Sequence, residues 1–349
     1  MDNLRRGWLK NGELSTWVER GIRGLTSNPS IFQKAISAGS DYDEQFGALV
    51  RGGVTVTDAY WDLVTTDIRG ALDLLRPVYD DSDGIDGFVS VEVAPDLARD
   101  GAGTTMAARR LHATIAEPNL YVKIPGTAEG IAPIRTMIAE RRSINVTLIF
   151  SLDRYAEVME AYLGGLEQAE GDLSRVSSVA SFFISRVDTE VDHRLEQIDT
   201  DAALALRGKA AVAQAQVAYQ RFRATFSGPR WDALAGRGAR VQRPLWASTS
   251  TKNPAYPDTA YVTPLIGPDT VNTMPEETID AFIDHGTVGR TIDADGTAAK
   301  ATLDAIAAVG VDLDDVARVL EDQGVAAFAK SFDELIGALD AKAAELGAS

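Results

Sequence analysis

Cysteine is absent from this chain of 349 residues, and histidine occurs only three times. Without thiols the chain has no disulfide, thiolate nucleophile, iron–sulfur cluster or cysteine-based zinc site. The histidines, His112, His193 and His285, are widely scattered and lack the spacing of metal ligands. The sequence therefore predicts a protein without a bound metal.

Positive charge and long apolar runs are scarce as well. The chain carries 34 Lys and Arg against 51 Asp and Glu, a formal net charge of −17, whereas nucleic-acid binding needs clustered basic residues. No apolar run approaches the ~20 residues of a membrane span. The first residues, MDNLRRGWLKNGEL, contain no apolar segment of signal-peptide length. We therefore expect a soluble, cytoplasmic protein without nucleic-acid or membrane partners.

What the chain does contain is a series of short, apolar, β-rich runs with longer helix-like stretches between them. The runs lie at residues 22–27, 88–93, 120–124, 144–150, 178–184, 243–249 and 261–266. This alternation predicts an α/β fold with a parallel sheet that is covered on both faces. Seven runs over this length favour a (β/α)8 barrel, with a doubly wound sheet as the alternative.

The two ends of the chain add detail to this prediction. The first run begins only at residue 22, after a helix-like segment at 8–20, so the first strand of a barrel is expected to be truncated or very short. From residue 297 the chain is rich in alanine and periodic, which predicts extra C-terminal helices. Since no linker or low-complexity tract interrupts it, residues 1–349 are expected to form a single domain.

Alternation of side chains within three of the runs separates an apolar face from a polar one. The polar faces of the runs at 88–93, 120–124 and 144–150 carry a carboxylate, an ammonium, an amide and a hydroxyl: Glu92, Lys123, Asn145 and Thr147. In a barrel this polar set points inside, near the C-terminal mouth where active sites lie. Burying such a set is costly unless each charge is paired or neutralised.

Lys123 is the centre of this interpretation. A lysine in an otherwise apolar strand is desolvated, which favours a neutral amine that can attack a carbonyl and form a Schiff base. The protonated imine then draws electrons from the adjacent C–C bond, so no organic cofactor is needed. Glu92 could act through water as a general acid and base. The alternative, of equal weight from this pattern, is a structural ion pair between Lys123 and Glu92.

Four further residues are candidates for binding an anionic, hydroxylated substrate. Asn28 ends the run GLTSNPS, although Asn-Pro also marks a turn. Ser181 and Arg186, in SFFISR, lie where a strand gives way to a loop, and Lys252 follows WASTST in a similar position. Hydroxyls and cations at barrel mouths often bind phosphate, whereas a single surface charge is usually only solvated.

Five segments, taken in order along the chain, together resemble transaldolase: GLTSNPSIFQKAI, VSVEVAP, NLYVKIPGTAEG, INVTLIFS and SFFISRVD. The similarity extends from Asp2 to the C-terminal helices, and LWASTSTKNP is similar to the longer bacterial members. The resemblance implies a barrel of the class I aldolase type. It also implies transfer of a dihydroxyacetone unit from sedoheptulose 7-phosphate or fructose 6-phosphate to glyceraldehyde 3-phosphate or erythrose 4-phosphate, in the non-oxidative pentose phosphate pathway. Sugar phosphates are thus the expected partners; no oligomeric state is indicated.

The resemblance also implies roles for individual residues. Four match catalytic positions: Lys123 is the Schiff-base lysine, Glu92 works with a catalytic water, Thr147 positions that water, and Asp2 shuttles the proton of the C4 hydroxyl. Four match substrate-binding positions: Asn28 and Asn145 hold the dihydroxyacetone hydroxyls, and Ser181 and Arg186 bind phosphate.

Two features depart from the family pattern. Only Met1 precedes Asp2 in this sequence, whereas the family has a first barrel strand there. Lys252 stands where many relatives have a second phosphate-binding arginine, and lysine keeps the charge but lacks the bidentate fork. Two alternative functions remain: a Schiff-base aldolase that releases free dihydroxyacetone, and an inactive barrel with an interaction role.

Overall fold

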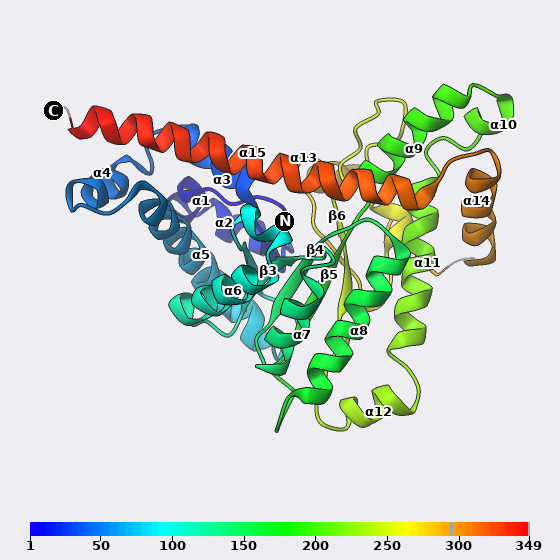
Figure 1. Cartoon of the computed structure of the whole chain (residues 1–349), viewed down its shortest axis with the longest axis horizontal. Helices are drawn as coiled ribbons and strands as arrows, with labels where there is room; N and C mark the ends of the chain where they lie inside the picture. Colours follow the sequence, from blue (N-terminus) through cyan, green and yellow to red (C-terminus); the bar gives the residue numbers. More distant parts are fainter. Residues whose placement is uncertain (294–295, 348–349) are drawn as a thin grey trace. The chain divides into compact units, whose positions relative to one another are not determined.

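The computed structural model describes residues 1–293 and 296–347 and divides them into two compact units (Figure 1). Unit 1 consists of Met1–Leu97, Met106–Lys123 and the chain from Val325 onward; unit 2 consists of Ala98–Thr105 and Ile124–Gly324. The described part contains seven strands, and each strand pairing recorded within a unit is parallel. The predicted α/β class is therefore confirmed, whereas a single domain stays a prediction.

In unit 1 the strands pair in chain order, β1 (Gly24–Thr26) with β2 (Phe88–Glu92) and β2 with β3 (Leu120–Pro125). Every residue of β2 and β3 is buried, as expected for parallel strands covered on both faces. The long helix α5 (Val56–Asp81) packs against β2, and its buried residues include Leu63, Ile68 and Leu72. This packing fixes the polar side chains of β2 and β3 inside the unit.

The helices of unit 1 are mostly amphipathic. They are α1 (Arg6–Asn11), α2 (Glu13–Glu19), α3 (Pro29–Ser37), α4 (Asp43–Arg51), α5 (Val56–Asp81), most of α6 (Gly101–Ile115) and the larger part of α15 (Leu313–Gly347). The predicted helix at 8–20 is split because Gly12, at φ 82°, takes a left-handed conformation that ends α1.

Beside β1, the backbone of Met1 makes two strand-like hydrogen bonds. The nitrogen of Met1 donates to the Gly24 carbonyl at 2.9 Å, and the Met1 carbonyl accepts from the Thr26 nitrogen at 2.9 Å. These bonds use the edge of β1 that faces away from β2. They do not make an eighth strand among the described residues.

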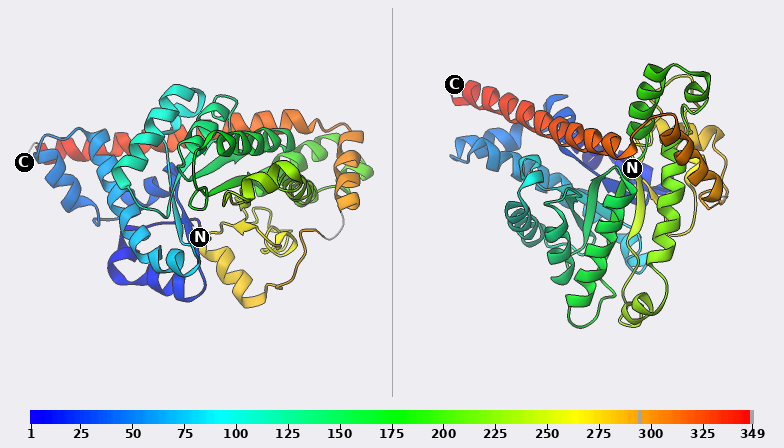
Figure 2. Two further views of the ribbon diagram at one scale, coloured as in Figure 1. Left: turned by 90° about the horizontal axis from the view of Figure 1, so that it is seen from below. Right: turned by 45° about the vertical axis from the view of Figure 1, so that its right-hand side comes forward.

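Unit 2 pairs four strands in chain order: β4 (Ile144–Ile149), β5 (Ser178–Phe183), β6 (Arg243–Ala247) and β7 (Val271–Asn272). Its helices are α7 (Ile131–Ala139), α8 (Leu152–Gln168), α9 (Ser185–Ile198), α10 (Asp201–Leu204), α11 (Ala210–Thr225), α12 (Pro229–Ala235), α13 (Glu276–His285) and α14 (Gly296–Ala308), with the short 3-10 turn η2 (Thr263–Leu265). A second 3-10 turn, η1 (Pro95–Arg99), crosses the boundary between the two units in the sequence. Helix α7 lies along α8, and α11 lies along α14 (Figure 2). The extra C-terminal helices, α14 and α15, confirm the prediction for the chain after residue 297.

The strand predicted at 261–266 is wrong. This segment contains the turn η2, and the last strand is β7, further along the chain. Pro264 lacks a backbone N–H and so cannot donate to a strand ladder. The carbonyl of Leu265 instead accepts a hydrogen bond from the indole nitrogen of Trp246 at 3.0 Å.

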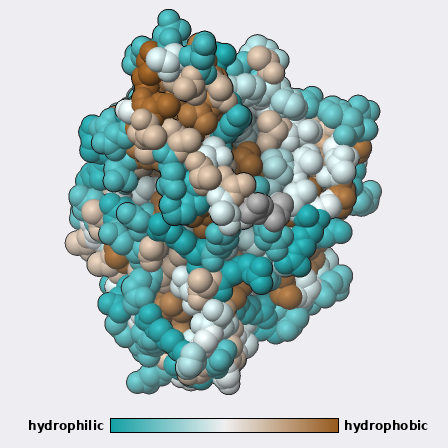
Figure 3. All heavy atoms as spheres, turned by 90° about the vertical axis from the view of Figure 1, so that its right-hand side faces the viewer, coloured by the Kyte–Doolittle hydropathy of each residue, from teal (hydrophilic) through white to brown (hydrophobic). Residues whose placement is uncertain are grey.

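The hydropathy of the surface is seen on one face of the molecule. Figure 3 shows a face on which hydrophilic side chains predominate and hydrophobic ones gather in a patch near its upper edge. No helix among the described residues is both long and apolar enough to cross a bilayer.

Candidate active site

Lys123 and Glu92 meet inside unit 1 because their strands pair in register. Glu92 of β2 and Lys123 of β3 are direct partners across the parallel pairing. The Lys123 Nζ lies 3.5 Å from Glu92 Oε2, and the two side chains are only 6% and 4% exposed. The alternation in the two runs therefore predicted the right faces, and the amine is sheltered beside a carboxylate.

The surroundings of this pair leave it only partly satisfied. Lys123 Nζ donates a hydrogen bond to the Ser27 carbonyl at 3.2 Å. At 3.5 Å the contact with Glu92 is an ion pair rather than a hydrogen bond, and no described residue donates to Oε2. Burial raises the pKa of the Glu92 carboxyl, although the charge of Lys123 opposes the rise. A buried carboxyl with a raised pKa is suited to holding and releasing a proton near neutral pH.

Asp2 lies on the same side of unit 1 as this pair. Its Oδ1 accepts a hydrogen bond from the Thr26 hydroxyl at 2.7 Å, so β1 fixes the orientation of the carboxylate. Its charge is close enough to Glu92 to contribute to the raised pKa of that residue. The structure thus places the predicted proton shuttle within the electrostatic reach of Glu92.

Asn28 begins α3 directly after β1. Its Oδ1 accepts from the Ile31 nitrogen at 3.0 Å, the typical bond of an N-cap residue, and Pro29 occupies the first helical position. Asn-Pro therefore marks the start of a helix here. Because the cap uses Oδ1, the Nδ2 group is the end that can donate to a substrate hydroxyl.

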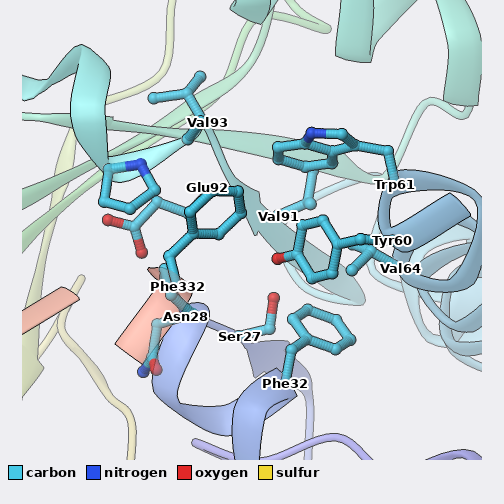
Figure 4. A pocket seen from close by; sticks show the side chains of 13 residues that line it. Ser27, Asn28, Phe32, Tyr60, Trp61, Val64, Val91, Glu92, Val93 and Phe332 are labelled. Carbon is cyan, nitrogen blue, oxygen red and sulfur yellow. The ribbon is translucent and has the colours of Figure 1, made fainter. Parts of the chain in front are cut away.

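A small cavity of about 10 Å³ adjoins Glu92 in unit 1. Its lining includes Ser27, Asn28, Tyr60 and Phe332, and Figure 4 shows the Tyr60 hydroxyl directed from α5 toward the side that holds Glu92. Such a volume is about the smallest that admits one water molecule. The sequence did not reveal Ser27, Tyr60 or Phe332, because serines and aromatics in strand ends and helices carry no specific signal.

In unit 2, Asn145 and Ser181 form a buried polar pair. Asn145 lies on β4 and Ser181 on β5, and the Ser181 hydroxyl donates to Asn145 Oδ1 at 2.7 Å. Both side chains are almost fully buried. The bond fixes the orientation of the Asn145 amide.

The Thr147 hydroxyl, on the same strand, is buried without a hydrogen bond. Its Oγ1 has no hydrogen-bond partner among the described residues, although the residue is 0% exposed. A buried hydroxyl without a partner is costly and points to an unfilled role, such as binding a water. The next residue, Leu148, has φ 60°, and the pairing of β4 with β5 is irregular from Val146 to Ile149. Such irregularities and strain are common beside active sites.

The two predicted cations of unit 2 lie on neighbouring segments. Arg186 is in the first turn of α9, half-buried, with its guanidinium over the Phe183 ring at 5.2 Å. Ser185 and Ser248, which ends the β6 segment, share a hydroxyl contact of 3.0 Å. Lys252, in the loop after β6, is exposed and donates to the Ser250 hydroxyl at 2.6 Å. Serine hydroxyls and cations are the kinds of group that bind phosphate.

Comparison with known proteins agrees with this chemistry. The family model described as transaldolase/fructose-6-phosphate aldolase matches residues 1–339. A protein named transaldolase from Thermobifida fusca is 52% identical over 341 residues, which cover 96% of this chain and 93% of the relative. The transaldolases of Mycolicibacterium smegmatis and Frankia alni are 51% and 50% identical, and the matches cover 97% and 100% of this chain and 92% and 95% of the relatives. This chain therefore belongs to the transaldolase/fructose-6-phosphate aldolase family.

Proposed function

We propose that this protein is a transaldolase of the non-oxidative pentose phosphate pathway. It takes a dihydroxyacetone unit from sedoheptulose 7-phosphate or fructose 6-phosphate and passes it to glyceraldehyde 3-phosphate or erythrose 4-phosphate. The observation that carries the proposal is the Lys123 amine, buried 3.5 Å from a carboxyl whose pKa is raised. It needs no cofactor, because the imine itself withdraws the electrons.

The first steps join the donor to the enzyme. The Lys123 amine attacks the C2 ketone of the donor, and Glu92 supplies the proton with which the C2 oxygen leaves as water. A raised pKa keeps Glu92 protonated to a higher pH than a free carboxyl, so the proton is available for this step. The product is a protonated imine on Lys123.

Cleavage and transfer follow from the imine. Asp2 takes the proton of the C4 hydroxyl, the C3–C4 bond breaks, and its electron pair moves toward the iminium nitrogen to form an enamine. The shortened aldose phosphate leaves. The enamine then adds to the aldehyde carbon of the acceptor, Asp2 returns the proton, and water hydrolyses the new imine to release the longer ketose.

The remaining candidate residues bind the substrate in this scheme. Asn28 and Asn145 hold the hydroxyls of the dihydroxyacetone unit, and Thr147 positions the water that Glu92 activates. Ser181, Arg186 and Lys252 bind the phosphate. The orphaned Thr147 hydroxyl and the oriented Asn145 amide support these roles.

The finer prediction for the fold, a closed (β/α)8 barrel over residues 1–349 with a short first strand, is part of the same proposal. The hydrogen bonds of Met1 to the free edge of β1 support a strand at that position. Because its substrates are phosphorylated sugars, the protein is proposed to act in the cytoplasm, without nucleic-acid or membrane partners.

A second candidate function is aldol cleavage that releases free dihydroxyacetone. The description of the matching family model includes fructose-6-phosphate aldolase beside transaldolase, and both activities use the same imine. An inactive interaction module is less well supported, because the buried Lys123–Glu92 pair is intact.

A coupled assay tests the proposed function. With fructose 6-phosphate and erythrose 4-phosphate, the wild-type protein should form sedoheptulose 7-phosphate at a rate that far exceeds its release of dihydroxyacetone. Lys123→Arg, which keeps the charge but is not a nucleophile, should abolish both reactions. Lys330→Arg, a change on an exposed residue, is the matched control and should retain them. Release without transfer would favour the aldolase, and full activity of Lys123→Arg would contradict the proposal.

A further inference from the structure

The helix α15 brings an aromatic ring to the cavity beside Glu92. Phe332 lines this cavity together with Tyr60, and the two rings meet edge to face, 5.3 Å apart at an interplanar angle of 80°. Trp61 packs against Tyr60 in the same way at 5.1 Å. In the view of Figure 4 the Phe332 ring lies between Glu92 and the Tyr60 ring, and Trp61 lies beyond Tyr60. Three aromatic side chains from two helices thus form one wall next to the carboxyl.

Polar contacts hold this part of α15 in place. The hydroxyls of Ser331 and Ser30 are 2.7 Å apart, and Gln33 donates to Glu334 at 2.8 Å. Further along, Lys342 pairs with Asp43 of α4. Ser331 directly precedes Phe332 in α15, and Glu334 and Lys342 follow it. These contacts therefore hold the part of the helix that carries the ring.

The wall limits how much water reaches Glu92. The cavity volume of about 10 Å³ admits about one water molecule. Tyr60 is buried, and the negative charge of Glu92 and, above all, burial raise its pKa, so its hydroxyl stays neutral. Phe332 and Trp61 are both half-buried, so these two rings are the parts of the wall that reach the solvent, and Phe332 is the one that α15 supplies.

Water at this place has a chemical consequence if the proposed function holds. The enamine on Lys123 can take a proton from water at C3, which gives an iminium ion and hydroxide. Hydroxide then adds to C2, and the adduct collapses to dihydroxyacetone and the free Lys123 amine. One water molecule is consumed and no transfer occurs. Glu92, which contacts Lys123, is the group through which added water would speed this loss.

We propose that Phe332 is a positioning residue that restricts water beside Glu92 and so favours transfer of the three-carbon unit over its release. This inference rests on the proposed function. It assigns to α15 the control over whether the three-carbon unit is transferred or released. Excluding water from reactive intermediates is a general task of residues that close an active site.

The test is the ratio of dihydroxyacetone released to sedoheptulose 7-phosphate formed, with fructose 6-phosphate and erythrose 4-phosphate as substrates. Phe332→Ala should raise the ratio roughly ten-fold by opening the wall. Phe332→Leu, which keeps apolar cover but not the ring edge, should give an intermediate value. Leu339→Ala, on a buried residue of the same helix that does not line the cavity, should lower thermal stability and leave the ratio unchanged.

The outcomes separate the two proposals. A wild-type protein that transfers sugar, with an unchanged ratio in Phe332→Ala, overturns the role of Phe332 alone. If Phe332→Ala does not fold, an unchanged ratio in Phe332→Leu has the same meaning. An equal rise in Leu339→Ala would also contradict the inference, because helix loosening would then suffice. A wild-type protein that shows no transfer contradicts the proposed function itself.

Discussion

Each unit contains a buried carboxyl with a raised pKa, and the two differ in their partners. Asp188 of unit 2 accepts hydrogen bonds from the Ala211 nitrogen at 2.8 Å and the Tyr261 hydroxyl at 2.9 Å. Glu92 of unit 1 has a lysine at 3.5 Å and an Oε2 to which no described residue donates. Burial is the main cause of the raised pKa in both.

This difference separates a structural group from a functional one. The bonds to Asp188 join α9 to the start of α11 and to Tyr261, so the carboxyl serves the packing of unit 2. The carboxyl oxygen of Glu92 without a donor adjoins a cavity that admits about one water molecule. In unit 2 the Thr147 hydroxyl likewise has no hydrogen-bond partner among the described residues.

Glu92→Gln should produce the largest effect. The amide keeps the shape but cannot exchange a proton, so kcat for transfer should fall about 10²–10⁴-fold. The measurement is steady-state transfer from fructose 6-phosphate to erythrose 4-phosphate, with a circular dichroism melt to confirm folding. Activity near that of the wild type would place Glu92 with Asp188 as a structural group.

Arg186→Ala should have the next largest effect. Loss of a charge-assisted hydrogen bond to phosphate, about 1.5–3 kcal/mol, should raise KM for the donor about 10–100-fold. Because Lys252 is exposed, Lys252→Ala should raise KM only a few-fold, and less so at high salt. An equal rise in KM for the two substitutions would contradict the larger role expected for Arg186.

Thr147→Val should separate function from stability. The substitution preserves shape and removes the orphaned hydroxyl, so the free energy of unfolding should rise by about 1 kcal/mol. Without a group to position water, kcat should fall about ten-fold. Thermal melts and transfer assays on the same preparation check both values. Loss of stability without loss of rate would mean that Thr147 is a structural residue.

Asp188→Asn should change pH-dependent stability more than activity. The folded-state pKa of about 6 lies above the usual 3.8, so the folded wild-type protein binds the proton more tightly than the unfolded chain. Its stability must therefore fall as pH rises from about 4 to about 6, by up to about 3 kcal/mol. The variant lacks this contribution, and its melting temperature relative to the wild type should rise across that interval. A difference in melting temperature between variant and wild type that does not change with pH would contradict the raised pKa of Asp188.

The sequence predicts the meeting of Glu92 and Lys123 because strand alternation is a local property. Six of the seven predicted strands overlap observed ones, and the polar faces of the runs at 88–93 and 120–124 correctly brought Glu92 and Lys123 together. The strand predicted at 261–266 failed because a tertiary contact, from Trp246 to Leu265, and a proline outweighed its β-rich composition. Tyr60 and Phe332 were not predictable, since only the packing of α5 and α15 brings them to the cavity.

Reductive trapping tests the central claim most directly. Wild-type protein mixed with fructose 6-phosphate and sodium borohydride should acquire a stable three-carbon or six-carbon adduct, and peptide mass mapping should find it on Lys123. Lys123→Arg should acquire none. An adduct on any other lysine, or none on the active wild-type protein, would contradict the account.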